Sequence, residues 1–360
     1  MLKGMRKLNL LLVMAGTLLA GAQTQTAATA EKHGPGSHLC DSLTAAETQV
    51  KPTRSEPLWP AGIAGIPAPD GPLGPSSSSP HIDLYVADDN STHTVVVVFP
   101  GGGYSCIAQA NEGIPIAQWW NARGVSAAVV TYRIAPEFHY PAPIEDGRRA
   151  VQWVRAHADE FRAAPNHLGL MGFSAGGHLA AITATTAFDP LPDGWLTLPD
   201  VSGVSSRPDF LVLGYPVITM KDGTHVHSRG NLLGAAPAAA LVGQMSAEDR
   251  VNGNTPPTFL FSTTDDATVP IDNSVEFYQA LVHAGVPVEM HLYEHGHHGL
   301  GLAEGTPEVS TWPQLLANWS VMHGWMSPQF AVTGQTFTRG QTSSAGAAST
   351  KTQGAAAAVR

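Results

Sequence analysis

A serine lies between closely spaced glycines where an apolar run gives way to small residues. The sequence at 172–176 reads GFSAG; it follows the apolar segment 168–171 and is followed by small, helix-compatible residues at 177–181. This order of strand, sharp turn and helix is typical of a nucleophile elbow, in which a strained turn presents the hydroxyl of Ser174. The outer glycines are expected where strand and helix approach too closely for side chains. A glycine-rich turn in another kind of α/β protein is the alternative.

Two downstream segments carry the base and the acid that a serine hydroxyl needs before it can act as a nucleophile. A histidine must take the hydroxyl proton, and a carboxylate must hold that histidine in the correct tautomer. A buried-strand pattern at 257–263 ends in Asp265 and Asp266, and another at 287–293 ends in the histidine-rich loop 294–300. The order serine, acid, histidine is the one that follows a nucleophile elbow, and both loops come after strands, where an open α/β sheet places its sites.

A glycine-rich loop upstream can stabilise a developing negative charge. The buried-strand pattern at 94–99 runs into PGGGY at 100–104. Three glycines let backbone N–H groups approach a ligand oxygen, and lipases and esterases build part of an oxyanion hole from such a loop. We expect the N–H groups of Gly102, Gly103 and Ala175 to receive this charge, and losing one such donor typically costs about 3–4 kcal/mol. A phosphate cradle is disfavoured because no Lys-Ser/Thr pair follows the glycines.

The two ends of the chain differ in composition from its middle. Residues 1–22 combine a basic start, an apolar run and small residues, which predict a secretory signal peptide and a secreted or periplasmic protein. Residues 23–75 are rich in Pro, Gly, Ser and Thr and are expected to form a leader that wraps or links. Residues 329–360 are predicted to be disordered, because they have little apolar content to bury. The remaining residues, 76–328, have the size of one catalytic domain, and no membrane span is expected after signal cleavage.

Charge and cysteine content narrow the classes of partner. The formal net charge of −10 becomes −13 once Lys3, Arg6 and Lys7 leave with the signal peptide. An acidic surface repels nucleic acid and anionic lipid and suits a neutral or cationic substrate. Two cysteines exclude a disulfide framework, and the sequence favours unpaired thiols at Cys40 and Cys106, although a single bridge between them stays open in an oxidising compartment.

Strand and helix patterns alternate along the chain and position these motifs. The alternation predicts an α/β fold with a mostly parallel sheet and helices on both faces. Residues 81–86 alternate polar and apolar and are therefore expected to form a half-exposed edge strand. Two irregular stretches, 189–208 and 215–255, interrupt the pattern; either could cover the site, and the second is the better candidate for a small cap. The expected strands are 81–86, 94–99, 125–132, 167–172, 209–214, 258–263 and 288–293, and the expected helices are 111–123, 145–161, 174–187, 272–284 and 307–326.

These motifs resemble the α/β-hydrolase superfamily, and within it the acetyl xylan esterase-like and hemicellulose esterase-like proteins of bacteria. The resemblance covers about residues 81–326 and implies the α/β-hydrolase fold. It rests on PGGGY at 100–104, YRIAPEFHYPAPIEDGRRAVQWVR at 132–155, GFSAGGHLAA at 172–181, RPDFLVLGYPVI at 207–218, NLLG at 231–234, TPPTFLFSTTDDATVP at 255–270 and EHGHHGLGL at 294–302.

The resemblance also implies roles for individual residues. In this superfamily the acid commonly precedes x-x-Val-Pro, which selects Asp266 over Asp265. The histidine usually lies in a Gly-x-His-Gly setting, which selects His298 over His297 as the partner of the elbow serine. Tyr104 either lines the substrate pocket or packs beside the glycine loop, and we assign it to the pocket.

The sequence therefore predicts an exported serine hydrolase of carboxylic esters that works through an acyl-enzyme and needs no cofactor. The resemblance indicates acetyl groups on xylan or a related plant polysaccharide as the substrate. A hormone-sensitive-lipase-like small-ester esterase, suggested by YRIAPE at 132–137, and a feruloyl esterase are the alternatives. A prolyl-oligopeptidase-type peptidase would need room for a propeller, and a non-catalytic binding protein would not need the complete set of motifs. Zinc binding is disfavoured because no His-Glu-x-x-His helix is present; its ligands would be His291, Glu294, His295, His297 and His298.

Overall fold

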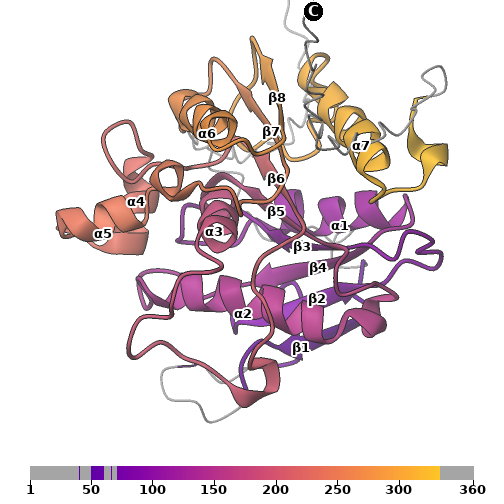
Figure 1. Cartoon of the computed structure of the whole chain (residues 1–360), viewed down its shortest axis with the longest axis horizontal. Coiled ribbons are helices and arrows are strands. Elements are labelled where there is room, and N and C mark those ends of the chain that lie inside the picture. Colours follow the sequence, from indigo (N-terminus) through magenta and orange to yellow (C-terminus); the bar gives the residue numbers. More distant parts are fainter. Residues whose placement is uncertain (1–39, 41–49, 61–65, 67–70, 333–360) are drawn as a thin grey trace, which may run out of the picture. The chain divides into compact units, whose positions relative to one another are not determined.

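The central feature of the fold is one mostly parallel sheet of eight strands. The computed structural model describes residues 40, 50–60, 66 and 71–332. Within this part of the chain the strand order is β1-β2-β4-β3-β5-β6-β7-β8, with β1 and β2 antiparallel to their neighbours and the other strands parallel (Figure 1). The strands are β1 (Arg54–Pro57), β2 (His81–Tyr85), β3 (Val95–Phe99), β4 (Ser126–Thr131), β5 (Leu168–Phe173), β6 (Phe210–Gly214), β7 (Thr258–Thr263) and β8 (Val288–Tyr293). This arrangement confirms the predicted fold class.

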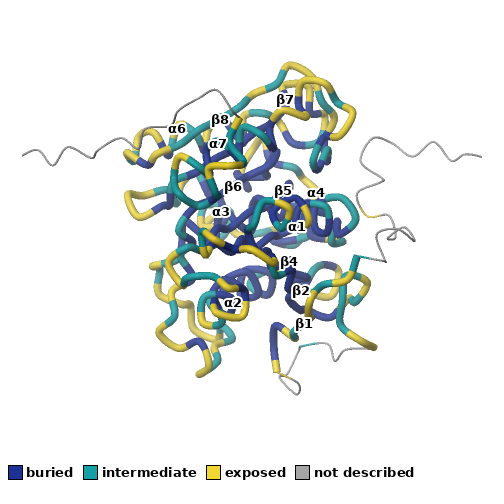
Figure 2. Tube along the Cα trace, turned by 90° about the vertical axis from the view of Figure 1, so that its right-hand side faces the viewer, coloured by how far each residue is buried: buried dark blue, intermediate teal, exposed yellow. Residues whose placement is uncertain are grey.

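Helices cover both faces of the sheet, and each face has its own hydrophobic core. Val95, Val97 and Phe99 of β3 belong to the core that includes α2, α3 and α6, whereas Val96 and Val98 belong to the core that includes α1 and α7. All five side chains are fully buried, as Figure 2 shows for the central strands. Burial on both faces explains why this strand is a continuous apolar run. The helices are α1 (Ile114–Asn121), α2 (Ala142–Ala156), α3 (Ser174–Thr185), α4 (Val226–Leu233), α5 (Ala239–Gln244), α6 (Asp272–His283) and α7 (Trp312–His323).

The first two strands differ from the sequence prediction. β1 lies inside the segment 23–75, which composition predicts to be a leader, so the sheet begins before residue 76. β2 is not an edge strand, because it pairs with both β1 and β4 and all of its residues are buried. Its polar residues are buried as partners of one another: His81 Nε2 lies 3.3 Å from Asp83 Oδ2, and Ser55 of β1 donates to the same carboxylate. β1 reads RSEP and therefore carries no apolar strand pattern.

The two irregular stretches pack against different parts of the fold. Residues 215–255 contain α4 and α5, and Asn231 of α4 donates to the carbonyl oxygen of Gly103 at 2.8 Å. This stretch therefore contacts the glycine loop, as expected of a small cap. The other stretch, 189–208, lies along α2, where Gln152 Nε2 donates to one of its carbonyl oxygens at 2.8 Å.

Helix boundaries follow the predictions with local differences at the ends. The expected helix 111–123 begins as a π-helical turn at Gln109–Gly113 and continues as α1. The expected helix 145–161 is α2 followed by a 3-10 turn at Ala158–Phe161. No helix in the described ranges has both the length and the apolar character that crossing a bilayer requires. The predicted signal peptide lies outside the described residues, and so does nearly all of the tail 329–360.

A disulfide joins Cys40 to Cys106, with the two Cα atoms 6.0 Å apart. The expectation of unpaired thiols is therefore wrong. Sequence spacing did not reveal the pair, because 66 positions separate the two cysteines and only the fold brings them together. Cys106 lies at the end of the glycine loop, where its N–H donates to the carbonyl oxygen of Gly102 at 3.1 Å.

Candidate active site

The predicted nucleophile, base and acid meet at the carboxyl ends of β5, β8 and β7. Ser174 Oγ lies 2.7 Å from His298 Nε2, and His298 Nδ1 lies 2.7 Å from Asp266 Oδ2. All three residues are buried. The second carboxylate oxygen of Asp266 accepts the N–H groups of Thr268 and Val269 at 2.8 and 3.0 Å, which fixes its orientation. The arrangement can move the serine proton to the imidazole while the carboxylate holds the other ring N–H.

The turn before α3 has the backbone geometry of a nucleophile elbow. Ser174 has a φ of +51°, in the left-handed region that a side-chain-bearing residue seldom adopts. A Cβ on Gly172 would collide with the carbonyl oxygen of Gly176, and one on Gly176 would collide with the carbonyl oxygen of Phe99. Close packing of β3, β5 and α3 therefore requires glycine on both sides of the serine, as the motif predicts.

Asp265 and His297, the alternatives to the acid and the base, lie outside this hydrogen-bonded chain. Asp265 accepts the N–H of Gly296 at 2.7 Å and contacts His295 Nδ1 at 3.1 Å, so its exposed carboxylate holds the histidine loop. His297 Nδ1 instead lies 2.8 Å from the backbone carbonyl oxygen of His298. The structure thus brings together the pair of side chains that the sequence selects.

The glycine loop lies beside the serine with unused backbone donors. A Cβ on Gly101 would lie 2.9 Å from the Cβ of Ser174, which shows how closely the loop approaches the elbow. Gly102 and Gly103 have φ values of +120° and +64°, and neither N–H donates to another residue that the structure describes. Ala175 lies in the first turn of α3, where N–H groups have no partner within the helix. These three N–H groups are therefore free to bind an oxygen of a ligand.

Tyr104 differs from the prediction that it lines the substrate pocket. Its side chain is completely buried, and its hydroxyl donates to His178 Nδ1 at 2.8 Å. His178 Nε2 in turn donates to the carbonyl oxygen of Met245 at 2.7 Å. Burial lowers the pKa of His178 to about 4, which keeps the imidazole neutral, so that Nδ1 can accept the hydrogen bond from the tyrosine hydroxyl. Tyr104 therefore packs in the interior beside the glycine loop, which is the alternative that the sequence left open.

A buried glutamate behind the site is the most important residue that the sequence reasoning missed. Glu112 is fully buried; its Oε2 accepts the N–H of Gly101 at 2.7 Å, and its Oε1 accepts the hydroxyl of Tyr215 at 2.8 Å. The same hydroxyl accepts the N–H of Gly301 at 2.8 Å. Burial raises the pKa of Glu112, although its hydrogen bond to Tyr215 and the nearby His298 oppose this. A single acidic residue at the start of a largely apolar helix was the available signal in the sequence.

This glutamate connects the two loops that carry the predicted oxyanion donors and the predicted base. Gly101 begins the glycine loop, and Gly301 follows the histidine loop. The ring of Tyr215 packs edge-on against that of His298, with the centroids 5.0 Å apart. Glu112 therefore contacts the glycine loop directly, and it contacts the imidazole of His298 indirectly, through the ring of Tyr215.

His225, from the segment before α4, also lies near the site. Its Cε1 would lie 4.0 Å from a Cβ on Gly103, and its Nδ1 lies 2.8 Å from Ser228 Oγ. Burial lowers the pKa of His225 to about 4, with the charge of His298 opposing protonation further. This segment therefore places a neutral imidazole beside the glycine loop.

The histidine-rich loop does not gather metal ligands in the described part of the chain. His291 Nε2 lies 2.9 Å from Glu289 Oε1, and His295 lies against Asp265, so these side chains are directed to different partners. Within the residues that the structure describes, no group of three or more histidine, cysteine, aspartate or glutamate side chains has an arrangement that could hold a metal ion.

Comparisons with known proteins point to one family. A family model described as BD-FAE matches residues 82–281. The solved structure of an acetyl ester-xyloside bifunctional hydrolase from Caldicellulosiruptor lactoaceticus is 40% identical, covers 77% of this chain and 99% of its own, and superposes with a TM-score of 0.68.

Two relatives are larger proteins. An acetylxylan esterase of Xylanibacter ruminicola is 33% identical over 236 residues, which are 64% of this chain and 46% of the relative. An endo-1,4-beta-xylanase B of Butyrivibrio fibrisolvens is 36% identical over 227 residues, which are 62% of this chain and 35% of the relative. The chain thus spans less than half the length of these two relatives.

Proposed function

The chain belongs to the BD-FAE family of α/β-hydrolase esterases, and we propose that it is a serine esterase in which Ser174 is the nucleophile, His298 the base and Asp266 the orienting acid. One observation carries this proposal: the continuous hydrogen-bonded chain from the serine hydroxyl through the imidazole to the carboxylate, with both distances 2.7 Å. The left-handed backbone of the serine and the free N–H groups of the adjacent loop supply the other requirements of acyl transfer.

The proposed reaction proceeds through an acyl-enzyme. Ser174 Oγ attacks the ester carbonyl carbon while His298 Nε2 takes its proton, and the carbonyl oxygen becomes an oxyanion bound by the N–H groups of Gly102, Gly103 and Ala175. The imidazolium then gives the proton to the departing alcohol oxygen. A water molecule attacks the acyl carbon in the second half-reaction, His298 takes the water proton, and the carboxylic acid product leaves as the serine recovers its own.

The proposed substrate is an acetylated xylan or a related plant polysaccharide. The relatives support this choice, since their names describe an acetylxylan esterase and an acetyl ester-xyloside hydrolase. The formal net charge of −10 is compatible with a neutral polysaccharide and unfavourable for an anionic one. Other small esters and feruloyl esters are the alternative substrates, and the identity of the acid released distinguishes them from acetylated xylan.

We also propose that the protein is exported. The basic, apolar and small-residue pattern of residues 1–22 supports a cleaved signal peptide. The disulfide between Cys40 and Cys106 supports the same conclusion, because disulfides persist mainly in oxidising compartments. Fractionation of cells that express the full chain, with N-terminal sequencing of the product, tests this proposal; an intact N-terminus in the cytoplasmic fraction would overturn it.

Acetate release from acetylated xylan is the direct test of the proposed function. Wild type is expected to release acetate, and Ser174→Ala is expected to lose about 10⁶-fold in kcat. A fluorophosphonate should label wild type at Ser174 and leave the variant unlabelled. If wild type hydrolyses feruloyl or small alkyl esters but releases no acetate from acetylated xylan, these esters replace acetylated xylan as the proposed substrate. Failure to react with the fluorophosphonate and with every ester would refute a serine esterase.

A further inference from the structure

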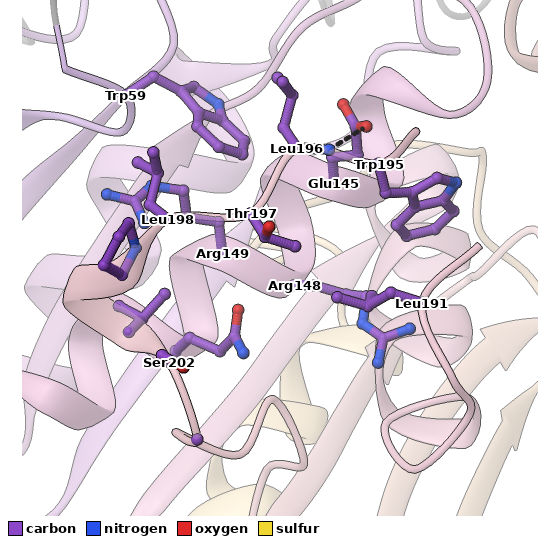
Figure 3. A pocket seen from close by; sticks show the side chains of 14 residues that line it. Trp59, Glu145, Arg148, Arg149, Leu191, Trp195, Leu196, Thr197, Leu198 and Ser202 are labelled. Atoms are coloured by element: carbon purple, nitrogen blue, oxygen red, sulfur yellow. Dashed lines mark hydrogen bonds between the residues drawn. The ribbon is translucent and has the colours of Figure 1, made fainter. Parts of the chain in front are cut away.

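A pocket separate from the candidate active site lies between α2 and the stretch 189–208. It has a volume of about 490 Å³, within the usual range for small-molecule sites. Its walls are formed by side chains of α2, by residues 191–203 and by Trp59, and none of the predicted catalytic or oxyanion residues lines it. Figure 3 shows Trp59 and Trp195 at opposite ends of the pocket, with Arg148 near the second. The pocket is thus distinct from the candidate active site.

Arg148 is the least satisfied charged group in this pocket. Its residue is 8% exposed, and only Nη2 has partners, the carbonyl oxygens of Ala187 and Asp189 at 3.3 and 3.4 Å. No carboxylate lies within ion-pair distance among the described residues, and the donors on Nε and Nη1 have no partner there. A guanidinium carries five N–H donors, so three of them remain available to a ligand. Burial lowers the pKa of Arg148, and the charge of Asp189 opposes this shift.

The other charged side chains of the pocket are already paired. Arg149 pairs with Asp200 through both terminal nitrogens, at 3.1 and 2.8 Å. Glu145 accepts the N–H of Leu196 at 2.9 Å and pairs with Arg133 at 2.8 Å. These pairs make the walls rigid, and they leave the recognition of a ligand to the groups that are not paired.

Two further groups complete a mixed polar and aromatic surface. Gln152 uses its Nε2 to donate to the carbonyl oxygen of Val204, whereas its Oε1 has no partner among the described residues and can accept a hydrogen bond. Trp195 is partly exposed, and the Arg148 Cζ lies 5.9 Å from its ring centroid. The pocket thus offers hydrogen-bond donors, an acceptor and an indole face. A pyranose ring has hydroxyl groups that donate and accept, and apolar C–H groups that pack on an aromatic face.

We propose that this pocket binds a sugar unit of the polysaccharide substrate at a distance from the ester under attack. Arg148 donates to sugar oxygens, Gln152 accepts from a sugar hydroxyl, and the ring packs on Trp195. The inference rests on the proposed function for its choice of saccharide.

A short chain of contacts connects the pocket to the glycine loop. Trp195 packs edge-on against Tyr140, with the centroids 6.1 Å apart. The N–H of Tyr140 donates to the carbonyl oxygen of Leu232 at 2.7 Å, and the neighbouring Asn231 donates to the carbonyl oxygen of Gly103 at 2.8 Å. The pocket and the candidate active site are thus connected through the segment just before α2 and through α4.

Binding of unacetylated xylohexaose to full-length Ser174→Ala protein tests the inference without any turnover. The affinity is measured by calorimetry, and the indole N–H signals of the eight tryptophans are followed by NMR. We expect the signal of Trp195, assigned by its loss in Trp195→Phe, to shift on addition of the hexaose. Adding Arg148→Gln or Trp195→Ala to the Ser174→Ala protein should weaken binding at least tenfold, whereas adding Arg123→Gln should not. Arg123 is a matched control, because it also lies over a tryptophan but does not line the pocket.

A second measurement separates this inference from the proposed function. In otherwise wild-type protein, the ratio of kcat/KM for acetylated xylan to kcat/KM for 4-nitrophenyl acetate should fall about tenfold in Arg148→Gln and in Trp195→Ala, and stay constant in Arg123→Gln. Circular dichroism verifies that each variant is folded. Absence of xylohexaose binding, or binding that neither pocket variant weakens, overturns the inference even if wild type releases acetate. If wild type hydrolyses neither acetylated xylan nor 4-nitrophenyl acetate, the proposed function is refuted instead.

Discussion

Replacing Glu112 by Gln removes one buried negative charge behind the proposed base while keeping the size of the side chain. The amide oxygen can still accept the N–H of Gly101, but the amide nitrogen then faces the hydroxyl of Tyr215, which loses its acceptor. The substitution therefore tests whether the charge assists His298 or whether the side chain only fills space.

The expected magnitude follows from the contacts. Glu112 touches Tyr215, whose ring lies 5.0 Å from the ring of His298, so the two charges are separated by roughly 8–10 Å. At an effective dielectric constant of about 20, such a charge stabilises an imidazolium by about 2 kcal/mol. The imidazolium forms as the serine proton is transferred, so Glu112→Gln should lower kcat/KM about 30-fold at alkaline pH, where the glutamate is ionised.

The pH dependence gives an independent measure of the same effect. Without the negative charge, the protonated form of the base is less stable, so the base stays active to lower pH. The acid limb of the kcat/KM profile should therefore move to lower pH in Glu112→Gln. Glu304→Gln is the control, because it removes an exposed carboxylate beyond the same histidine loop and should leave the limb in place. An acid limb that coincides with wild type, in a folded Glu112→Gln protein, would refute an electrostatic role.

Three further outcomes follow from the structure. Asp266→Asn should lower kcat by about 10³–10⁴-fold. Asp265→Asn alters an exposed carboxylate outside the hydrogen-bonded chain and should lower kcat less than about tenfold. Similar losses of kcat in the two variants would contradict the assignment of Asp266 as the acid. Burial lowers the pKa of His178 to about 4, so the unfolded chain gains a proton below pH 6.5 that the folded protein gains only near pH 4. The free energy of unfolding should fall by about 3 kcal/mol over this range from His178 alone, and urea titrations of His178→Gln should show a correspondingly smaller fall. Replacing Cys40 and Cys106 together by Ser should lower the free energy of unfolding by about 4 kcal/mol for a separation of 66 positions, and an unchanged urea midpoint would contradict a stabilising bridge.

Local sequence order predicted the parts of the site that follow strands directly. The glycines around Ser174, the turn that carries Asp265 and Asp266, and the histidine loop each follow a parallel strand, so their position at one edge of the sheet follows from the topology. The same reasoning predicted the donors of the glycine loop. Their roles in catalysis remain predictions until the variants are measured.

Other residues could not be found in this way, because their partners are distant in sequence. Glu112 accepts a hydrogen bond from Tyr215, 103 positions away, and the π-helical turn that carries the glutamate meets the tyrosine only in the folded chain. Tyr104 was misassigned because its burial depends on His178 within α3. The buried pair His81 and Asp83 made an interior strand look like an edge strand, since two polar residues that satisfy each other have the same pattern as two that face solvent.

The position of β3 between the two cores has a consequence for variation and engineering. Each substitution in this strand changes the packing of the core that receives the side chain. The strand leads directly into the glycine loop, so altered packing on either face can shift that loop. β8 is the opposite case: none of its residues is fully buried, and it lies at the edge of the sheet. Sequence drift and designed changes should therefore accumulate on β8, while β3 stays nearly constant across functional variants.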